Sequence, residues 1–244
     1  MRYLILSDIH ANLAALEAVL EDAGEFDKIW CLGDLVGYGP EPNECIEKLR
    51  QFDHLCVAGN HDWAALDRLD LEEFNVEAQK SCRWTQAQLT PDNRAYLEGL
   101  PTTLIEERFT LVHGSPRQPV WEYVLYPSIA RPNFKHFGTQ FCLVGHTHVP
   151  VIFSLTQQEF GEYCELLQLQ LNSPTPLGDL RSIINPGSVG QPRDGDSRAS
   201  YMLLDLEHDT IEYRRVVYPI ARTQKLMAEV NLPERLITRL AHGW

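Results

Sequence analysis

The sequence lacks the features that mark membrane-spanning, secreted and nucleic-acid-binding proteins. No apolar run approaches the roughly 18 residues that a membrane span needs, and Met1 leads directly into the expected strand at residues 2–7, which leaves no room for a signal peptide. The formal net charge of −13 argues against a general nucleic-acid binder, because polyanions are held by dense Lys and Arg surfaces. We therefore expect a cytoplasmic protein without membrane attachment.

Cysteine is also sparse and unpatterned. The chain has 6 cysteines and no CxxC pair. Cys31, Cys56 and Cys142 lie inside apolar, strand-like runs, where a free thiol behaves as a small buried hydrophobe. This usage predicts reduced core cysteines, as in cytoplasmic proteins, and not a disulfide framework.

The hydrophobic pattern predicts a mixed α/β fold that changes character near residue 150. With 244 residues and 44% apolar content, the chain can bury one sizeable core, so we expect one domain over 1–244. The expected helices are residues 13–20 (capped by Asn12), 42–50, 74–89 and 221–241, the last interrupted near Pro233. The expected strands are residues 3–6, 28–32, 54–58, 109–112, 140–144, 151–155, 163–169, 181–184, 201–206 and 211–217.

A βα half followed by a β half predicts two sheets packed face to face with helices outside, a four-layer double β-sandwich. Residues 157–162 and 172–179 are expected to be loops. The helical insertion at 63–97 could cap a site, but its amphipathic spacing fits an ordinary packed helix pair equally well. The end of the chain, residues 221–241, forms a C-terminal helical segment in this interpretation.

Polar clusters at the C-terminal ends of five apolar runs are the most informative feature. Five of the nine histidines fall in them. Carboxylate, amide and imidazole ligands together suit Mn, Fe, Zn or Ni better than Ca or a thiolate site. About seven ligands are too many for one tetrahedral zinc and fit two adjacent metals that share a carboxylate. The clusters read Asp8-Ile9-His10, Gly33-Asp34, Gly59-Asn60-His61-Asp62, Val112-His113-Gly114 and Gly145-His146-Thr147-His148.

At these five blocks the chain resembles the calcineurin-like metallophosphoesterases, over roughly residues 1–190. The resemblance implies a double β-sandwich and two metal ions. It implies Asp8, His10 and His148 as ligands of one ion, and Asn60, His113 and His146 as ligands of the other. Asp34 matches the bridging carboxylate, and His61 matches the histidine beside the scissile phosphate, a transition-state stabiliser or leaving-group acid.

The second block departs from one branch of that superfamily. Serine/threonine protein phosphatases carry Gly-Asp-x-Val-Asp-Arg-Gly there, whereas Gly37 and Tyr38 stand here at the positions of the second Asp and the phosphate-clamping Arg. This favours the smaller prokaryotic-type phosphodiesterases and phosphatases. A protein phosphatase is the alternative enzyme, and a non-catalytic scaffold is a further alternative, although every ligand position is filled.

Candidate substrate-binding residues follow from weaker signals. Arg193 or Arg117 could replace the missing clamp, although an arginine at such a position is more often simply solvated. The glycines of residues 185–193 could present backbone N–H groups to an anion. An aromatic wall that stacks a base, or simple loop packing, would use Tyr38, Trp121, Tyr123 and Tyr126.

The sequence therefore predicts a binuclear-metal phosphoesterase that hydrolyses a small phosphodiester, phosphomonoester or nucleotide by attack of a metal-bridging hydroxide. Mn or Fe are the expected ions, with Zn, Ni or Co as other candidates. His61 is expected to be protonated near the developing charge. Asp62 either orients His61 or caps the following helix.

Overall fold

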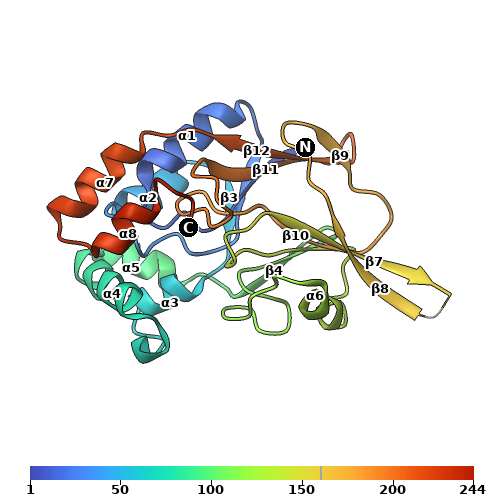
Figure 1. Cartoon of the computed structure of the whole chain (residues 1–244), viewed down its shortest axis with the longest axis horizontal. Helices are drawn as coiled ribbons and strands as arrows, with labels where there is room; N and C mark the ends of the chain where they lie inside the picture. The colour runs from blue at the N-terminus through green and yellow to red at the C-terminus, as the bar shows by residue number, and fades with distance from the viewer. Residues whose placement is uncertain (160) are drawn as a thin grey trace.

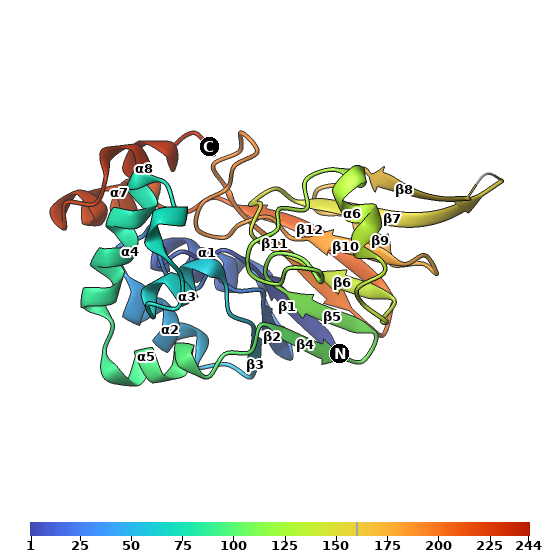
Figure 2. The same cartoon turned by 90° about the horizontal axis from the view of Figure 1, so that it is seen from below.

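Two six-stranded sheets form the centre of the computed structural model, which describes residues 1–159 and 161–244. The sheets lie face to face (Figures 1 and 2). The first has the order β3-β2-β1-β11-β12-β9, with β1 Arg2–Leu6, β2 Lys28–Cys31, β3 His54–Cys56, β9 Pro174–Pro176, β11 Ala199–Asp205 and β12 Thr210–Val216. The second has the order β4-β5-β6-β10-β7-β8, with β4 Thr103–Glu106, β5 Phe109–Val112, β6 Phe141–Leu143, β7 Val151–Gln158, β8 Gly161–Leu167 and β10 Ser182–Asn185.

The helices gather mainly at one end of the molecule, while the β7–β8 hairpin projects from the other (Figures 1 and 2). They are α1 Leu13–Ala23, α2 Pro42–Leu49, α3 Asn60–Ala65, the 3₁₀ helix η1 Leu71–Glu73, α4 Val76–Gln88, α5 Pro91–Glu98, α6 Pro127–Asn133, α7 Ile220–Glu229 and α8 Glu234–Arg239. The chain therefore turns at Pro233 between α7 and α8, as expected from its sequence.

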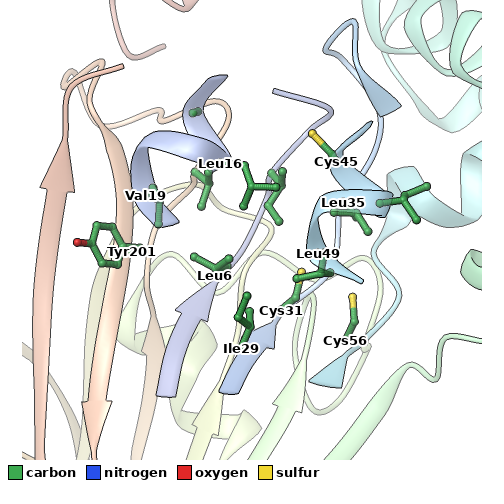
Figure 3. Packing of buried hydrophobic residues seen from close by; sticks show 14 of the residues in the cluster. Leu6, Leu16, Val19, Ile29, Cys31, Leu35, Cys45, Leu49, Cys56 and Tyr201 are labelled. Atoms are coloured by element: carbon green, nitrogen blue, oxygen red, sulfur yellow. The ribbon is translucent and has the colours of Figure 1, made fainter. Parts of the chain in front are cut away.

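The alternating side chains of strand β1 pack into the two hydrophobic layers on either face of the first sheet. Its side chains alternate between two hydrophobic clusters, as the twofold period of a strand requires. Tyr3 and Ile5 point between the sheets, where Tyr3 packs on Trp30 with ring centroids 4.3 Å apart. Leu4 and Leu6 point to the opposite face and pack against α1 (Figure 3). A continuous apolar run is therefore a strand covered on both faces.

Helices complete the outer layers on both sides of the sandwich. Asn12 caps α1, because its side chain accepts a hydrogen bond from Ala15 N at 3.3 Å. Leu16 and Val19 of α1 are buried against the first sheet (Figure 3). Helix α6 contacts β7 and β8 and covers the second sheet. The helix–sheet–sheet–helix order confirms the predicted fold.

Parallel strands bring the polar clusters to one region. β1, β2 and β3 run parallel in the first sheet, and β5, β6 and β10 run parallel in the second. Loops that follow the carboxyl ends of parallel strands meet at one edge, which is where α/β proteins bind ligands. The clusters follow β1, β2, β3, β5 and β6.

Several elements differ from the sequence prediction. Strand β4 and helix α6 were not predicted, and residues 172–179, expected to be a loop, contain the short edge strand β9. Prolines at both ends of β9 mask its strand character, although an edge position tolerates them. Residues 157–158 and 161–162 belong to β7 and β8 and not to a loop; residue 160 lies outside the described residues. In the described chain, no helix has the length and apolarity needed to cross a membrane.

Candidate metal centre and substrate pocket

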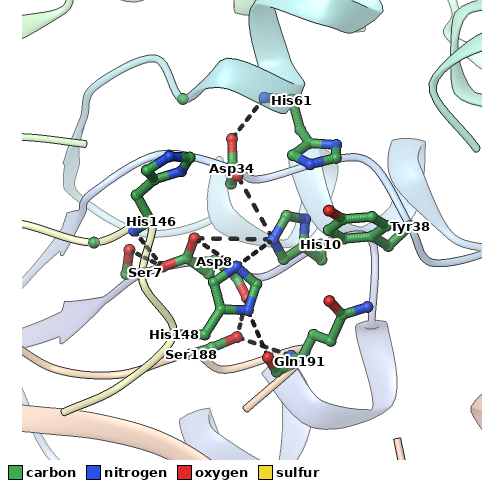
Figure 4. Close-up of polar contacts among 12 residues, drawn as sticks. Ser7, Asp8, His10, Asp34, Tyr38, His61, His146, His148, Ser188 and Gln191 are labelled. Carbon is green, nitrogen blue, oxygen red and sulfur yellow. Dashed lines mark hydrogen bonds and ion pairs between the residues drawn. The ribbon is translucent and has the colours of Figure 1, made fainter. Parts of the chain in front are cut away.

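Seven predicted ligands come together in loops from both sheets. Figure 4 labels five of them: Asp8, His10, Asp34, His146 and His148. The first sheet supplies side chains that follow β1, β2 and β3, and the second supplies those that follow β5 and β6. All are buried. They are Asp8, His10, Asp34, Asn60, His113, His146 and His148.

One group contains Asp8, His10, Asp34 and His148, each offering one ligand atom within 4.8 Å of the others. His148 Nε2 lies 3.2 Å from Asp8 Oδ1, and His10 Nε2 lies 3.6 Å from Asp34 Oδ2. Two atoms that are each about 2.1 Å from one ion lie roughly 3–4 Å apart. The spacing therefore suits a transition-metal ion.

The second group contains Asp34, His113 and His146, with Asn60 beside them. His113 Nε2 lies 3.4 Å from Asp34 Oδ2 and 3.1 Å from both His146 Nδ1 and Asn60 Oδ1. Asp34 Oδ2 therefore faces both groups. This is the position that a carboxylate shared by two cations would occupy.

Backbone carbonyls fix which nitrogen of each ring faces the centre. His10 Nδ1 faces Val36 O at 3.2 Å, His148 Nδ1 faces Gln191 O at 2.5 Å, and His113 Nδ1 faces Leu32 O at 2.8 Å. A carbonyl only accepts, so each of these nitrogens carries the proton. The opposite nitrogens turn their lone pairs inward. In metal sites, outer-shell acceptors such as these carbonyls fix the tautomer and orientation of histidine ligands in the same way.

Several hydrogen-bond acceptors of the centre face one another with no donor from the described residues between them. His10 Nε2 and His148 Nε2, both without protons in these tautomers, face each other at 3.1 Å. Asp8 Oδ1 and Asp34 Oδ2 are buried and have no hydrogen-bond partner in the described chain. Unpaired acceptors in a buried site cost free energy unless a cation or proton satisfies them. The residues present therefore fit divalent metal ions.

Electrostatics keep most of these groups in their metal-binding forms. Burial lowers the pKa of His146 to about 3 and also lowers the pKa of His10 and His148, so these rings are neutral. Burial opposes ionisation of Asp34, yet the neighbouring His113 and His61 rings lower its pKa overall. His113 is different: although burial opposes its charge, Asp34 raises its pKa to about 9. A proton there would be displaced when a cation binds.

The backbone at the centre is strained. Five ligands have left-handed backbone conformations, with φ of 54° at Asp8, 49° at His10, 52° at Asp34, 64° at His146 and 59° at His148. Such residues cost on the order of 1–3 kcal/mol each and persist where the surroundings fix them, commonly at functional sites. Here the strain turns successive side chains inward from tight loops.

His61 stands beside the centre and not among the ligands. Its ring lies over Tyr38 with centroids 4.2 Å apart and meets Phe74 edge-on at 5.2 Å. Its Nδ1 lies 3.5 Å from Cys82 Sγ, which belongs to α4. Burial lowers the pKa of His61 to about 4, so the imidazole is neutral. Burial therefore opposes the protonated form that the sequence led us to expect.

Asp62 serves the backbone and does not orient His61. Its Oδ2 accepts from Gly59 N at 2.9 Å, and its Oδ1 accepts from Val36 N at 3.1 Å. The carboxylate thereby caps α3 and ties it to the β2 loop. Of the two roles left open by the sequence, the contacts support capping.

A cavity of about 170 Å³ opens onto these groups. Tyr123 stacks on His146 with centroids 3.9 Å apart, and Phe74 packs on Trp121 at 5.0 Å. Arg193 Nη2 donates to Gln191 Oε1 at 2.9 Å, while its buried Nε has no partner in the described chain. The lining combines the two metal-ligand groups with aromatic rings and one guanidinium: Asp34, Tyr38, Asn60, His61, Glu73, Phe74, Asn75, Ala78, Trp121, Tyr123, His146, His148 and Arg193.

Two of the expected substrate contacts are placed elsewhere. Arg117 does not line the cavity, because its guanidinium pairs with Glu122. Tyr126 is 63% exposed and lies outside the aromatic lining, whereas Phe74 belongs to it. Tyr38 and Arg193 do line the cavity, as predicted.

The glycine-rich segment 185–193 is not an anion-binding nest. Gly190 N donates to Asp8 O at 2.9 Å, and Val189 N donates to Ser7 O at 3.0 Å. Gly187 N donates to Asn185 Oδ1 at 2.8 Å. Because these N–H groups are used internally, Val189 and Gly190 hold the end of β1 in place, and the two glycines do not present their N–H groups to an anion.

Sequence reasoning missed three residues of the site. Ser7 Oγ donates to Asp8 Oδ2 at 2.6 Å and so orients a ligand carboxylate. Its place directly before Asp8 is the only available signal. Cys82 and Phe74 contact His61 from a helical segment, and no local sequence motif indicates these contacts.

Comparisons with known proteins agree with this geometry. The family model for the calcineurin-like phosphoesterase superfamily domain matches residues 1–209. A metallophosphoesterase crystal structure from Sphaerobacter thermophilus is 48% identical, with a TM-score of 0.89, and covers 100% of this chain and 99% of that one. An uncharacterized protein of Methanocaldococcus jannaschii is 38% identical over 246 residues, 98% of this chain and 97% of that protein. Phosphodiesterase YfcE of Escherichia coli is 28% identical over 218 residues, covering 84% of this chain and 88% of YfcE.

The fold and the buried Asp/His centre define a metal-dependent phosphoester hydrolase. The chain belongs to the calcineurin-like phosphoesterase superfamily, as its motifs indicated.

Proposed function

We propose that the protein is a binuclear phosphoesterase acting on a small phosphodiester, phosphomonoester or nucleotide. The observation that carries this proposal is the position of Asp34 Oδ2, which faces both ligand groups. Asp8, His10 and His148 would hold one ion, and Asn60, His113 and His146 the other. We expect Mn or Fe, with Zn, Ni or Co as substitutes, because mixed oxygen and nitrogen ligation accommodates all of them.

Two divalent ions would supply Lewis acidity and an activated water for displacement at phosphorus. The side chains of the chain then have separate tasks. Two carboxylates among the ligands leave net positive charge at the centre, which favours an anionic ester. His61, neutral and held against Tyr38, would donate a hydrogen bond to the phosphoryl group in the transition state. Arg193 would clamp a phosphate oxygen.

The pocket supports a small substrate. Its volume of about 170 Å³ is below that of pockets for drug-sized ligands, roughly 300 Å³ or more. Tyr38 lies where protein phosphatases carry an arginine, and its ring is buried against His10 and His61. A small pocket walled by aromatic rings suits an aryl or nucleoside ester better than a phosphorylated protein loop. The name of the YfcE relative supports diesterase activity.

The helical segment 63–97 contributes one wall of this pocket. Phe74, Asn75 and Ala78 line the cavity, and Cys82 contacts His61. We propose that η1 and α4 cap the site, whereas α5 packs beside α2. We also propose one phosphoesterase domain and a cytoplasmic location, in keeping with the five buried cysteines.

Metal analysis tests the binuclear proposal. Purified protein should contain close to two transition-metal equivalents, and Asp34→Asn should lose at least one together with nearly all activity. Asp53→Asn is the matched control, because Asp53 is 71% exposed and pairs only with Lys28 in the described chain. A stable single-metal protein with full turnover would contradict the proposal.

A substrate panel tests the size argument. Bis-p-nitrophenyl phosphate, p-nitrophenyl phosphate, nucleotides and phosphoserine peptides are compared with Mn, Fe, Co, Ni, Zn and Mg in parallel. The highest kcat/KM should belong to a small ester or nucleotide. A phosphopeptide that matches or exceeds the best small substrate would show that the protein is a protein phosphatase.

A further inference from the structure

A second hollow, of about 270 Å³, adjoins the catalytic pocket. Four residues line both hollows, so the two are continuous along this wall: Tyr38, Asn75, Tyr123 and Arg193. The second hollow is completed by Glu77 of α4 and by Arg235, Leu236 and Arg239 of α8. Helix α8 lies beyond residue 209, outside the part of the chain that the superfamily model matches.

Three guanidinium groups line this hollow against one carboxylate. Arg235 Nη1 lies 4.0 Å from Glu77 Oε1, and Arg235 is 82% exposed, so this ion pair is weak. Arg239 Nε donates to the backbone oxygen of Trp244. Neither Arg239 nor Arg193 forms an ion pair with an Asp or Glu side chain in the described chain.

The arrangement is costly for the protein alone. Burial, together with the nearby Arg193 charge, lowers the pKa of Arg239 to about 10. Like charges that are gathered in a hollow repel each other, and a buried guanidinium without an anion is poorly solvated. The chain has 34 acidic against 21 basic residues, so carboxylates were available to neutralise the cluster. A hollow in which three guanidinium groups face a single carboxylate side chain indicates an external anion.

We propose that Arg235 and Arg239 bind a second phosphate of the substrate, distant from the one that is cleaved, while Arg193 lies between the two hollows and clamps the phosphate at the metal centre. This inference rests on the proposed function. The catalytic pocket is small, about 170 Å³, so a larger substrate would extend past the rings of Tyr38 and Tyr123 into the second hollow. A guanidinium fork matches two phosphate oxygens. The substrate class is therefore a nucleotide-like phosphoester with phosphates on either side of a ring-bearing spacer.

A matched pair of chromogenic esters tests this directly. Thymidine 5′-(p-nitrophenyl phosphate) and its 3′-phosphorylated form share the scissile bond and differ only in the distal phosphate. The wild-type protein should prefer the 3′-phosphorylated ester in kcat/KM by about tenfold or more. Arg235→Ala/Arg239→Ala should lose most of this preference. Arg222→Ala is the control, because Arg222 lies on α7 and pairs with Glu17 and Glu41.

Single variants guard against a folding defect. Arg235→Ala removes an exposed side chain, so it should fold normally and still lower the preference by severalfold. Arg239→Lys keeps the charge and should retain more of the preference than Arg239→Ala. A wild-type ratio near one would overturn the second phosphate site, as would an unchanged ratio in the double variant.

A binding measurement separates this inference from the proposed function. Calorimetry compares thymidine 3′,5′-bisphosphate with thymidine 5′-monophosphate on the purified holoprotein. If neither ester is hydrolysed but the bisphosphate binds more tightly through Arg235 and Arg239, the proposed function fails and the second site stands. If both esters are hydrolysed and both nucleotides bind equally in every variant, the second site alone fails.

Discussion

At the scale of single residues, the site separates metal ligation from phosphate recognition. The ligands turn lone pairs toward two points and are held from behind by backbone carbonyls. His61 belongs to neither group. Its ring contacts the Tyr38, Phe74 and His10 rings and the Cys82 thiol, and its backbone N donates to Asp34 Oδ1 at 2.8 Å. A neutral, desolvated imidazole that abuts the centre is suited to hydrogen bonding with a phosphoryl oxygen. It is less suited to donating a proton.

Replacing His61 tests this distinction. His61→Ala should keep the metal content of the wild type and lower kcat by roughly 10²–10⁴, the range for a lost catalytic group. The loss should be similar for p-nitrophenyl and alkyl esters, because a neutral donor stabilises the phosphoryl charge and not the leaving group. His208→Ala, at an exposed position, is the control. A loss concentrated on alkyl esters would show instead that His61 protonates the leaving group, and loss of a metal would show that it is a ligand.

At the scale of elements, the loop after β2 determines how closely α3 approaches the centre. Gly37 has φ of 88°, and a Cβ there would lie 2.6 Å from His61 Nδ1. The protein-phosphatase pattern has an aspartate at this position. In this chain the space is filled by the His61 ring itself, and Cys82 contacts its Nδ1. The helical segment 63–97 thereby takes part in placing His61.

Gly37→Ala should displace His61 while leaving the ligands in place. We expect metal content to be kept and kcat/KM to fall by about tenfold or more. Gly195→Ala is a close control. Gly195 has nearly the same φ, 86°, and no atom lies within 4 Å of the position that an added Cβ would occupy. Both variants carry the backbone cost of a left-handed alanine, roughly 1–2 kcal/mol. Equal activity of the two variants would show that the contact with His61 is unimportant.

The elements also show what sequence can and cannot predict. Asp8, Asp34 and His113 could be found because each directly follows an apolar strand, and parallel strands bring such positions together. Cys82 could not, because its approach depends on how α4 packs across α3. The sequence also could not show that Arg117 is unavailable for substrate binding. Its partner Glu122 is close in sequence, but the ion pair forms only in the folded loop.

At the scale of the whole molecule, the ligand centre joins the two sheets. Asp8, Asp34 and Asn60 follow strands of the first sheet, and His113 and His146 follow strands of the second. The hydrophobic layer between the sheets already holds them together. Ions bound by both sets of loops would add a second connection, which exists only when both sheets are correctly placed. Metal binding and global stability should therefore be linked.

Chelation measures this linkage. A ligand that binds only the folded state at about 100 times its Kd adds about 2.7 kcal/mol. In a domain of this size that corresponds to roughly 5–10 °C in Tm. Removing metal with a chelator should lower the Tm of the wild type and of Asp53→Asn by such an amount, and readdition of Mn should restore it. Asp34→Asn should show a smaller shift, because the carboxylate shared by both groups is lost. If metal-free and metal-loaded wild type unfold at the same temperature, the ions do not join the sheets, and the centre is catalytic without being structural.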